Sequence, residues 1–318
     1  MGTPDFSVPA LENLIKEHEV AAVITQPDKR KGRGKAMAYP PVKEAALAHG
    51  IPVLQPKKVR EEEFIEKLKE IAPDVIVVVA FGQILPEDIL SLPRYGCINI
   101  HASLLPRYRG AAPIQWAIIN GEKETGVTTM YMAKGLDTGD MIDKVVVPIE
   151  EKETGESLHD KLSAAGGELI LKTLSDIENG TAQRTVQDDS ESCYAGMLSR
   201  ELGEIDWTGD AASIERLIRG LNSWPSAYTF LSGKTLKLWD ADVQEDIPDP
   251  ETDEPGALQK ASIPGTVIRV TRKHFYVMTG KGILKVNEVQ LQGKKRMPTH
   301  SFLLGCPLRE GIRLGGEQ

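Results

Sequence analysis

The sequence predicts a doubly wound α/β domain, built on a parallel sheet, followed by a small antiparallel β-barrel. Its length of 318 residues exceeds one typical domain and favours two. The β-branched runs Val20–Thr25 and Val75–Ala80 are typical of buried parallel strands, and helical patterns lie between them. From residue 228 onward, short strand patterns alternate with turns, as they do in small barrels.

Apolar periodicity predicts the elements of the first domain. After Ser7, the apolar residues Val8, Leu11, Leu14 and Ile15 recur at helical spacing. The other expected helices are Val42–His49, Glu61–Ile71, Ala111–Asn120 and Ser157–Asn179. The later strands are expected at Gly126–Tyr131 and Met141–Ile149.

A polar, irregular stretch from Gly180 to Ser192 indicates the start of a linker. We therefore expect the first domain at residues 1–183, a linker at 184–204 and the second domain at 205–318. A helix around Ala211–Arg219 is expected to precede the barrel strands Tyr228–Leu231, Thr235–Trp239, Gly265–Val270, Phe275–Met278 and Ile283–Val289. The acidic, Pro-containing insertion Asp240–Glu254 is expected to form a mobile loop.

The stretch from Cys97 to Gly110 is the first candidate for a functional site. It begins as a short strand in which Asn99 and His101 face the same side, and it breaks into a Pro-containing turn at Ser103. In open α/β sheets, ligands bind at this C-terminal edge of the strands. A strand end with a buried, hydrogen-bonded histidine gives the same pattern, so both interpretations stay open here.

The turn Gly135–Met141 carries a second candidate, Asp137. Glycines on both sides let the backbone bend tightly, so that this carboxylate can point inward. An Asx-turn between two strands is the alternative.

Charge is distributed unevenly along the chain. Residues 256–318 hold eleven basic and three acidic side chains, a net of +8, which leaves −16 for the rest of a chain whose total is −8. The loop from Gln26 to Pro41 carries five cations interspersed with glycines. Either segment suits phosphate contacts or an ordinary solvated surface. The loop lacks Walker spacing because Ala36 follows Lys35, which argues against a nucleotide cradle.

Several classes of protein are disfavoured by what the sequence lacks. It has no apolar run long enough to span a membrane and no pattern of a secretory signal. Its three cysteines form no Cys-x-x-Cys pair, so neither a disulfide framework nor a thiolate metal site is indicated, and a reducing cytoplasm fits. No Gly-x-Gly-x-x-Gly follows a strand, which argues against a nicotinamide-dependent oxidoreductase.

Seven segments together carry a resemblance that covers nearly the whole chain. They are Gly2–Phe6, Gln26–Asp28 with Gly32–Lys35, Asn99–His101 with Ser103–Ile114, Leu136–Asp140, Ile205–Trp207, Ile218–Asn222 and Gly293–Met297. With these segments the chain resembles the methionyl-tRNA formyltransferases of the folate-dependent formyltransferase family. The resemblance implies a Rossmann-like formyltransferase domain followed by an OB-like, tRNA-binding barrel.

The resemblance also implies an activity and a set of site residues. The implied enzyme is a monomeric cytoplasmic transferase that moves the formyl group of 10-formyltetrahydrofolate to the α-amine of methionyl initiator tRNA for translation initiation. The alternative is another amine as acceptor, on a nucleotide or an amino sugar. The implied residues are Asn99, His101 and Asp137 for catalysis, Ser103, Leu104, Leu105, Pro106, Phe81 and Gly82 for folate, and Arg33, Lys35, Lys294, Lys295 and Arg296 for tRNA.

The implied chemistry explains why an amide, an imidazole and a carboxylate are needed. Attack of an amine on a formyl carbon places negative charge on the former carbonyl oxygen, to which Asn99 and His101 can donate. A nearby carboxylate favours the imidazolium form of His101, and Asp137 can also move the proton that the amine loses. No metal is expected, since His101 and Asp137 lack a third ligand nearby. Cys97, on the same strand, is a residual candidate for a covalent nucleophile.

The sequence departs from the family pattern at two places. Asn222-Ser223-Trp224-Pro225 stands where the family usually has Asn-Pro-Trp-Pro. Relatives also begin with an apolar strand before Gly-Thr-Pro, whereas here Met1 directly precedes it. We therefore expect a start several residues upstream, because the sheet would otherwise lack a central strand and leave backbone groups of its neighbours unpaired.

Overall fold

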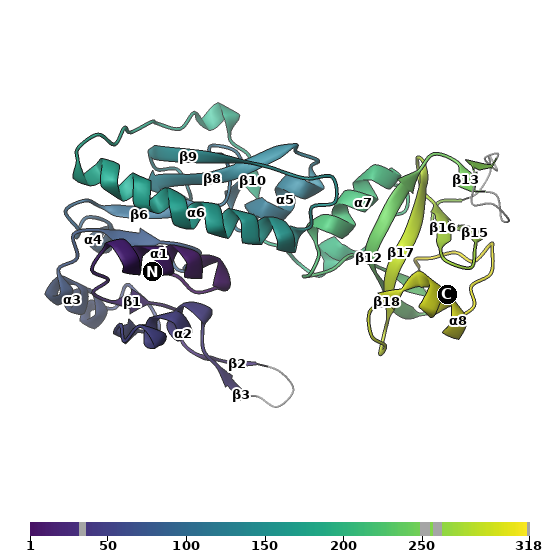
Figure 1. Ribbon diagram of the computed structural model, residues 1–318, viewed down its shortest axis with the longest axis horizontal. Coiled ribbons are helices and arrows are strands. Elements are labelled where there is room, and N and C mark those ends of the chain that lie inside the picture. The colour runs from purple at the N-terminus through teal and green to yellow at the C-terminus, as the bar shows by residue number, and fades with distance from the viewer. Residues whose placement is uncertain (32–35, 249–254, 257–262, 317–318) are drawn as a thin grey trace. The chain divides into compact units, whose positions relative to one another are not determined.

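The computed structural model describes residues 1–31, 36–248, 255–256 and 263–316. The chain divides into two compact units (Figure 1). The first unit comprises Met1–Ile114, Glu124–Ile149 and Ser157–Gly196, and the second comprises Gln115–Lys123, Glu150–Glu156 and Met197–Gln318. Within the described ranges, no helix is both long and apolar enough to cross a lipid bilayer.

Parallel and antiparallel strands combine in the first unit. Its main sheet has the order β5-β6-β8-β9, with β5 (Ile76–Val78) parallel to β6 (Cys97–His101). The strands β8 (Glu124–Tyr131) and β9 (Met141–Pro148) are added antiparallel. A separate parallel pair is formed by β1 (Val23–Ile24) and β4 (Val53–Leu54). The runs predicted for β1 and β5 are longer than the strands observed.

Helices cover both faces of this sheet, which confirms the predicted α/β architecture. The helices of this unit are α1 (Val8–Glu17), α2 (Pro41–Ala48), α3 (Glu62–Ile71), α4 (Glu87–Leu90) and α6 (Gly155–Glu178), while α5 (Pro113–Ile119) lies where the chain passes from the first unit to the second. On one face, Leu68 of α3 and Ile89 of α4 pack in one core cluster with Cys97 of β6. On the other face, α6 packs so closely that a Cβ at Gly166 would lie 2.9 Å from the Ile100 side chain.

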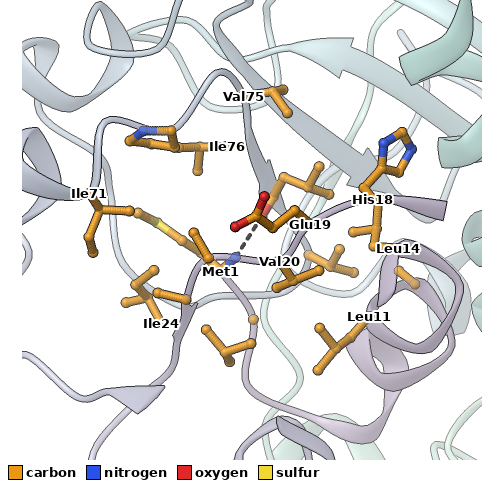
Figure 2. A pocket seen from close by; sticks show the side chains of 18 of the residues that line it. Met1, Leu11, Leu14, His18, Glu19, Val20, Ile24, Ile71, Val75 and Ile76 are labelled. Atoms are coloured by element: carbon orange, nitrogen blue, oxygen red, sulfur yellow. Dashed lines mark hydrogen bonds between the residues drawn. The ribbon is translucent and has the colours of Figure 1, made fainter. Parts of the chain in front are cut away.

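A cavity of about 460 Å³ lies between β1 and β5. Met1 and Gly2 bridge one end of it, because Gly2 N–H donates to Ile24 O at 3.0 Å and Val79 N–H donates to Met1 O at 2.9 Å. Figure 2 shows Met1 among apolar side chains, including Leu11 and Ile71. The amine of Met1 donates to Val77 O at 2.6 Å, and burial lowers its pKa to about 5.

The second unit is built on a curled antiparallel sheet, which confirms the predicted OB-like fold class in the form of a half-barrel. Its order is β11 (Tyr228–Leu231), β12 (Lys234–Gln244), β17 (Ile283–Leu291), β16 (Phe275–Met278) and β15 (Val267–Val270), with β18 (Met297–Pro298) beside β17. The helix α7 (Ala211–Gly220) begins where the Asp210 side chain accepts from Ser213 N–H, and it buries Ile214 and Ile218 in the core that contains Phe275. The helix α8 (Thr299–Gly305) also packs on this core through Phe302.

Short elements complete the fold. They are the 3₁₀ helices η1 (Asp5–Ser7), η2 (Asp189–Glu191) and η3 (Glu201–Gly203), and the strands β2 (Lys29–Lys31), β3 (Ala36–Ala38), β7 (Arg109–Gly110), β10 (Tyr194–Ala195), β13 (Ile247–Pro248) and β14 (Pro255–Gly256).

The prediction of a loop over Asp240–Glu254 is wrong in its first third. Residues Asp240–Gln244 continue β12 and pair with β17, because Asn287 Nδ2 donates to the carboxylates of Asp240 and Asp242 and thereby accommodates two acidic residues in the sheet. Residues 249–254 lie outside the described ranges.

Candidate active site

The carboxyl end of β6 carries two buried polar side chains on one side of the strand. Every residue of this strand is buried, with Asn99 9% and His101 6% exposed. Backbone pairing with β5 on one side and β8 on the other fixes the strand at the middle of the sheet. Within the part of the chain that the structure describes, no residue hydrogen-bonds the Asn99 amide.

The two ring nitrogens of His101 have different surroundings. Nε2 lies 2.9 Å from Tyr108 O, and because a carbonyl only accepts, Nε2 carries a hydrogen. Nδ1 lies 3.6 Å from Asp137 Oδ2, which is too long for a hydrogen bond but within ion-pair distance. Nδ1 is consequently the nitrogen that can gain a proton and donate it to a ligand.

The carboxylate of Asp137 points inward, toward His101. Its side chain is 13% exposed, and Oδ2 accepts a hydrogen bond from Gly110 N–H at 2.9 Å. The backbone of Asp137 has φ of 51°, in the left-handed region that few non-glycine residues adopt. Of the two interpretations that the sequence leaves open for this turn, the geometry favours the inward carboxylate.

The turn that follows β6 is held mainly by its own polar groups. Ser103 is fully buried, and its hydroxyl donates to Arg107 O at 2.7 Å. Thr128 Oγ1 donates to Ser103 O at 2.7 Å and accepts from Leu105 N–H at 3.2 Å. The Leu105 side chain packs in a small core with Met130 and Met141, and the Leu105–Pro106 peptide bond is cis. The side chains of Ser103 and Leu105 thus stabilise the fold.

Phe81 and Gly82 lie just beyond the carboxyl end of β5, the strand parallel to β6. The Phe81 ring is buried in the core, and its carbonyl accepts from Thr3 Oγ1 at 3.1 Å and from Gln26 Nε2 at 3.2 Å. Gly82 is exposed with φ of 81°. Both residues therefore stand at the same sheet edge as His101.

The residues predicted to contact nucleic acid differ in their surroundings. Arg33 and Lys35 lie outside the described residues, between the paired strands β2 and β3. Lys294 and Lys295 are exposed. Arg296 forms an ion pair with Glu288, and its guanidinium lies 4.6 Å from the centre of the Trp239 ring.

Cys97 packs in the core below the site. Its thiol donates to Ile89 O at 3.5 Å, and burial raises the pKa of this thiol to about 12. A thiolate is therefore rare at neutral pH. In the described ranges, no three or more His, Cys, Asp or Glu residues form a group that could hold a metal ion.

Sequence reasoning missed the contribution of the segment around Gln187. This residue contacts both Arg109 and the turn of Asp137. It lies in a polar, irregular stretch with no periodicity, so that nothing in the local pattern marks it.

Comparison with known proteins identifies the family of the chain. Residues 1–174 match the family "Formyl transferase", and residues 197–307 match "Formyl transferase, C-terminal domain". The chain belongs to the formyltransferase family. A protein of Agathobacter rectalis named methionyl-tRNA formyltransferase is 59% identical, with 98% of this chain and 97% of the relative covered. One of the same name in Lachnospira eligens is 54% identical, with 99% and 98% covered.

Two solved structures share the fold. The sugar 3N-formyl transferase WlaRD, solved in the presence of dTDP and 5-N-formyl-THF, matches with a TM-score of 0.64 at 20% identity, covering 92% of this chain and 97% of the other. HypX from Aquifex aeolicus, in complex with tetrahydrofolic acid, matches with a TM-score of 0.58 at 19% identity, covering 86% and 48%. At these identities the likeness concerns the fold alone.

Proposed function

We propose that this formyltransferase moves the formyl group of 10-formyltetrahydrofolate to the α-amine of methionyl initiator tRNA and so supplies N-formylmethionyl-tRNA for translation initiation. The observation that carries the proposal is the placement of Asn99, His101 and Asp137 at one sheet edge. Near-full-length relatives named methionyl-tRNA formyltransferase give the acceptor. We place the enzyme in the cytoplasm and expect a monomer.

In the proposed mechanism, Asn99 and His101 stabilise the charge that develops during the reaction. The amine nitrogen forms a bond to the formyl carbon, and the former carbonyl oxygen becomes negative. The Asn99 amide, which no described residue occupies, and the Nδ1–H of a protonated His101 donate to this oxygen. The Nε2–H is already held by Tyr108 O, so Nδ1 is the nitrogen assigned to the oxygen.

Asp137 is proposed to accept the proton that the amine loses and to pass it on to the leaving nitrogen. An α-ammonium must lose a proton before its nitrogen can attack, and the Asp137 carboxylate accepts it, directly or through a water. The same proton then passes to the folate nitrogen as the bond from that nitrogen to the formyl carbon breaks, and the nitrogen of the new amide releases its second proton to solvent. Until it accepts that proton, the carboxylate places a negative charge beside His101, with Oδ2 3.6 Å from Nδ1.

The folate is proposed to bind along the edge formed by the turns after β5 and β6. Backbone groups of Ser103, Leu104, Leu105 and Pro106 on one side, and of Phe81 and Gly82 on the other, are its candidate contacts. Backbone N–H and C=O groups suit the hydrogen-bonding edge of a pterin. We divide the chain into a catalytic domain at residues 1–183, a linker at 184–204 and a tRNA-binding domain at 205–318.

Comparing formyl acceptors tests the proposed function. With 10-formyltetrahydrofolate as donor, kcat/KM is measured for methionyl initiator tRNA, uncharged tRNA, glycinamide ribonucleotide and a nucleotide-linked amino sugar. We expect transfer to methionyl initiator tRNA to exceed all others by at least a hundredfold. Faster transfer to the ribonucleotide or the sugar would instead support the alternative acceptor that the sequence leaves open.

Substituting Cys97 tests for a covalent intermediate. Because burial holds its thiol protonated, we expect Cys97→Ala to keep kcat for formyl transfer within about threefold of the parent. The variant also leaves a small cavity that lowers stability by about 1 to 2 kcal/mol, which thermal unfolding measures. A loss of kcat of a hundredfold or more, with the fold intact, would point to a thioester and contradict the proposed mechanism.

The two groups of basic residues are proposed to act differently on tRNA. Arg33 and Lys35 contact the acceptor end beside the amino acid, whereas Lys294, Lys295 and Arg296 add affinity for the phosphate backbone. We therefore expect Arg33→Ala to lower kcat/KM for initiator tRNA about tenfold more than for methionylated elongator tRNA. Neutralising residues 294–296 together is expected to lower the affinity for both tRNAs equally and to reduce the salt dependence of binding.

Both variants are assayed with the same two methionylated tRNAs over a range of salt concentrations. Equal losses on both tRNAs for Arg33→Ala would contradict its proposed role in discrimination. An unchanged salt slope for the triple variant would contradict a backbone contact. Since Arg296 already pairs with Glu288, we expect most of the change in slope to come from Lys294 and Lys295.

A further inference from the structure

The segment Thr185–Ala195 lies between the two family matches, which end at residue 174 and resume at 197. It nevertheless makes backbone hydrogen bonds to β9 and to residues 109–111. Thr185 exchanges two backbone hydrogen bonds of 2.9 Å with Met141. Further along, Arg109 N–H donates to Cys193 O and Ala111 N–H donates to Ala195 O, each at 2.9 Å. This part of the proposed linker, which we call the strap, is therefore hydrogen-bonded to the first unit.

One side chain of the strap points into the site region. Gln187 is 7% exposed, and its Nε2 donates to the carbonyls of Asp137 and Gly139, each at 2.8 Å. Its Oε1 accepts from Arg109 Nε at 3.0 Å. The opposite orientation of the amide would set an oxygen against two carbonyls, so the three contacts fix which end of the amide faces the turn.

These contacts restrain the backbone of the turn that carries Asp137. Asp137 has φ of 51°, a conformation that a non-glycine residue keeps only where its surroundings enforce it. Gln187 fixes the carbonyls on both sides of Thr138 with a single amide group. The direction of the Asp137 carboxylate, toward Gly110 N–H and His101, follows from the position of that backbone.

We propose that Gln187 is a positioning residue, which acts on formyl transfer by holding the Asp137 turn and not by touching a substrate. The assignment of the affected step rests on the proposed function, whereas the positioning itself does not. A displacement of a carboxylate by about 1 Å lowers catalysis by up to roughly a hundredfold, so a contact at this distance from the chemistry has a measurable effect.

The substitution Gln187→Glu removes the two donors to the turn while keeping an acceptor for Arg109. The matched control is Asp189→Asn, since Asp189 pairs with the other side of the same guanidinium, at 2.8 Å from Nη1, and none of its hydrogen bonds reaches the turn among the described residues. We expect kcat to fall between tenfold and a hundredfold in Gln187→Glu. KM values for tRNA and folate should stay within about twofold, and the control should keep its kcat.

Two further measurements separate positioning from a general loss of structure. In an Asp137→Asn background, Gln187→Glu should cost less than threefold in kcat, because the group that it positions is already gone. Amide hydrogen exchange at Gly110, whose N–H donates to Asp137, should accelerate at least tenfold in Gln187→Glu and not in the control. Gln187→Leu, which removes all three contacts, should show the same acceleration.

Equal losses of kcat in the parent and the Asp137→Asn background would overturn the proposal, as would unchanged exchange at Gly110 in both Gln187 variants. The exchange measurement needs no substrate. If it gives the expected result while the parent formylates no tRNA, the positioning stands and the proposed function fails.

Discussion

Replacing Asn99 by alanine is expected to lower kcat for formyl transfer by a hundredfold to a thousandfold. One well-placed donor to a developing oxyanion contributes about 3 kcal/mol, and the Asn99 amide is proposed as one of two such donors. KM values for both substrates should change little, because the charge that the amide stabilises forms only in the transition state. Steady-state kinetics with methionyl initiator tRNA and 10-formyltetrahydrofolate measures both quantities.

The control for this variant is Asn13→Ala. Asn13 Nδ2 also makes a tertiary contact, to Gly167 O at 2.9 Å on α6, so its loss reports the effect of removing an asparagine amide far from the reacting atoms. We expect the control to keep its kcat. A loss for Asn99→Ala that appears only in KM would show that the amide binds substrate without stabilising the transition state, and this would contradict its proposed role.

Asp137→Asn is expected to lower kcat by a hundredfold to ten-thousandfold. An asparagine at this position keeps an oxygen for Gly110 N–H, so the turn is preserved, but it can neither accept the proton of the amine nor place a negative charge beside His101. The loss therefore combines general-base catalysis with the missing charge beside His101. The kcat of this variant is measured beside that of Asp140→Asn, which removes a carboxylate from the same turn.

Asp140 is suitable as a control because its backbone carbonyl, rather than its side chain, pairs with Tyr131. We expect Asp140→Asn to keep kcat within about threefold. If the two variants lose activity equally, the charge of the turn matters and the identity of Asp137 as the base is wrong.

Much of the site could be predicted because its parts are local in the sequence. The two-residue spacing of Asn99 and His101 on a strand is enough to place both on one side, and the glycines around Asp137 mark a tight turn. The local patterns do not show that the strand of Asn99 and His101 lies next to the turn of Asp137. Gly110 N–H and Gln187 bring the turn to β6, and both act through contacts between distant parts of the chain.

The fold shows the same division between local and distant determinants. Amphipathic periodicity predicted α3 and α7 to within a residue or two, since each buries one apolar face. The strands β1 and β5 are shorter than their β-branched runs, because a cavity separates the two strands where pairing partners would be needed. The acidic end of β12 was missed because composition does not reveal that Asn287 lies across from Asp240 and Asp242.

The central claim is tested most directly by finding where the formyl group goes. A single turnover is run with 10-formyltetrahydrofolate labelled in the formyl carbon and with methionyl initiator tRNA as acceptor. The ester bond between the amino acid and the tRNA is then hydrolysed, and the labelled product is identified. The account predicts that nearly all transferred label is found in N-formylmethionine, at a rate that falls at least a hundredfold in Asn99→Ala. Label in free formate, or on an acceptor other than the α-amine of methionine, would contradict it.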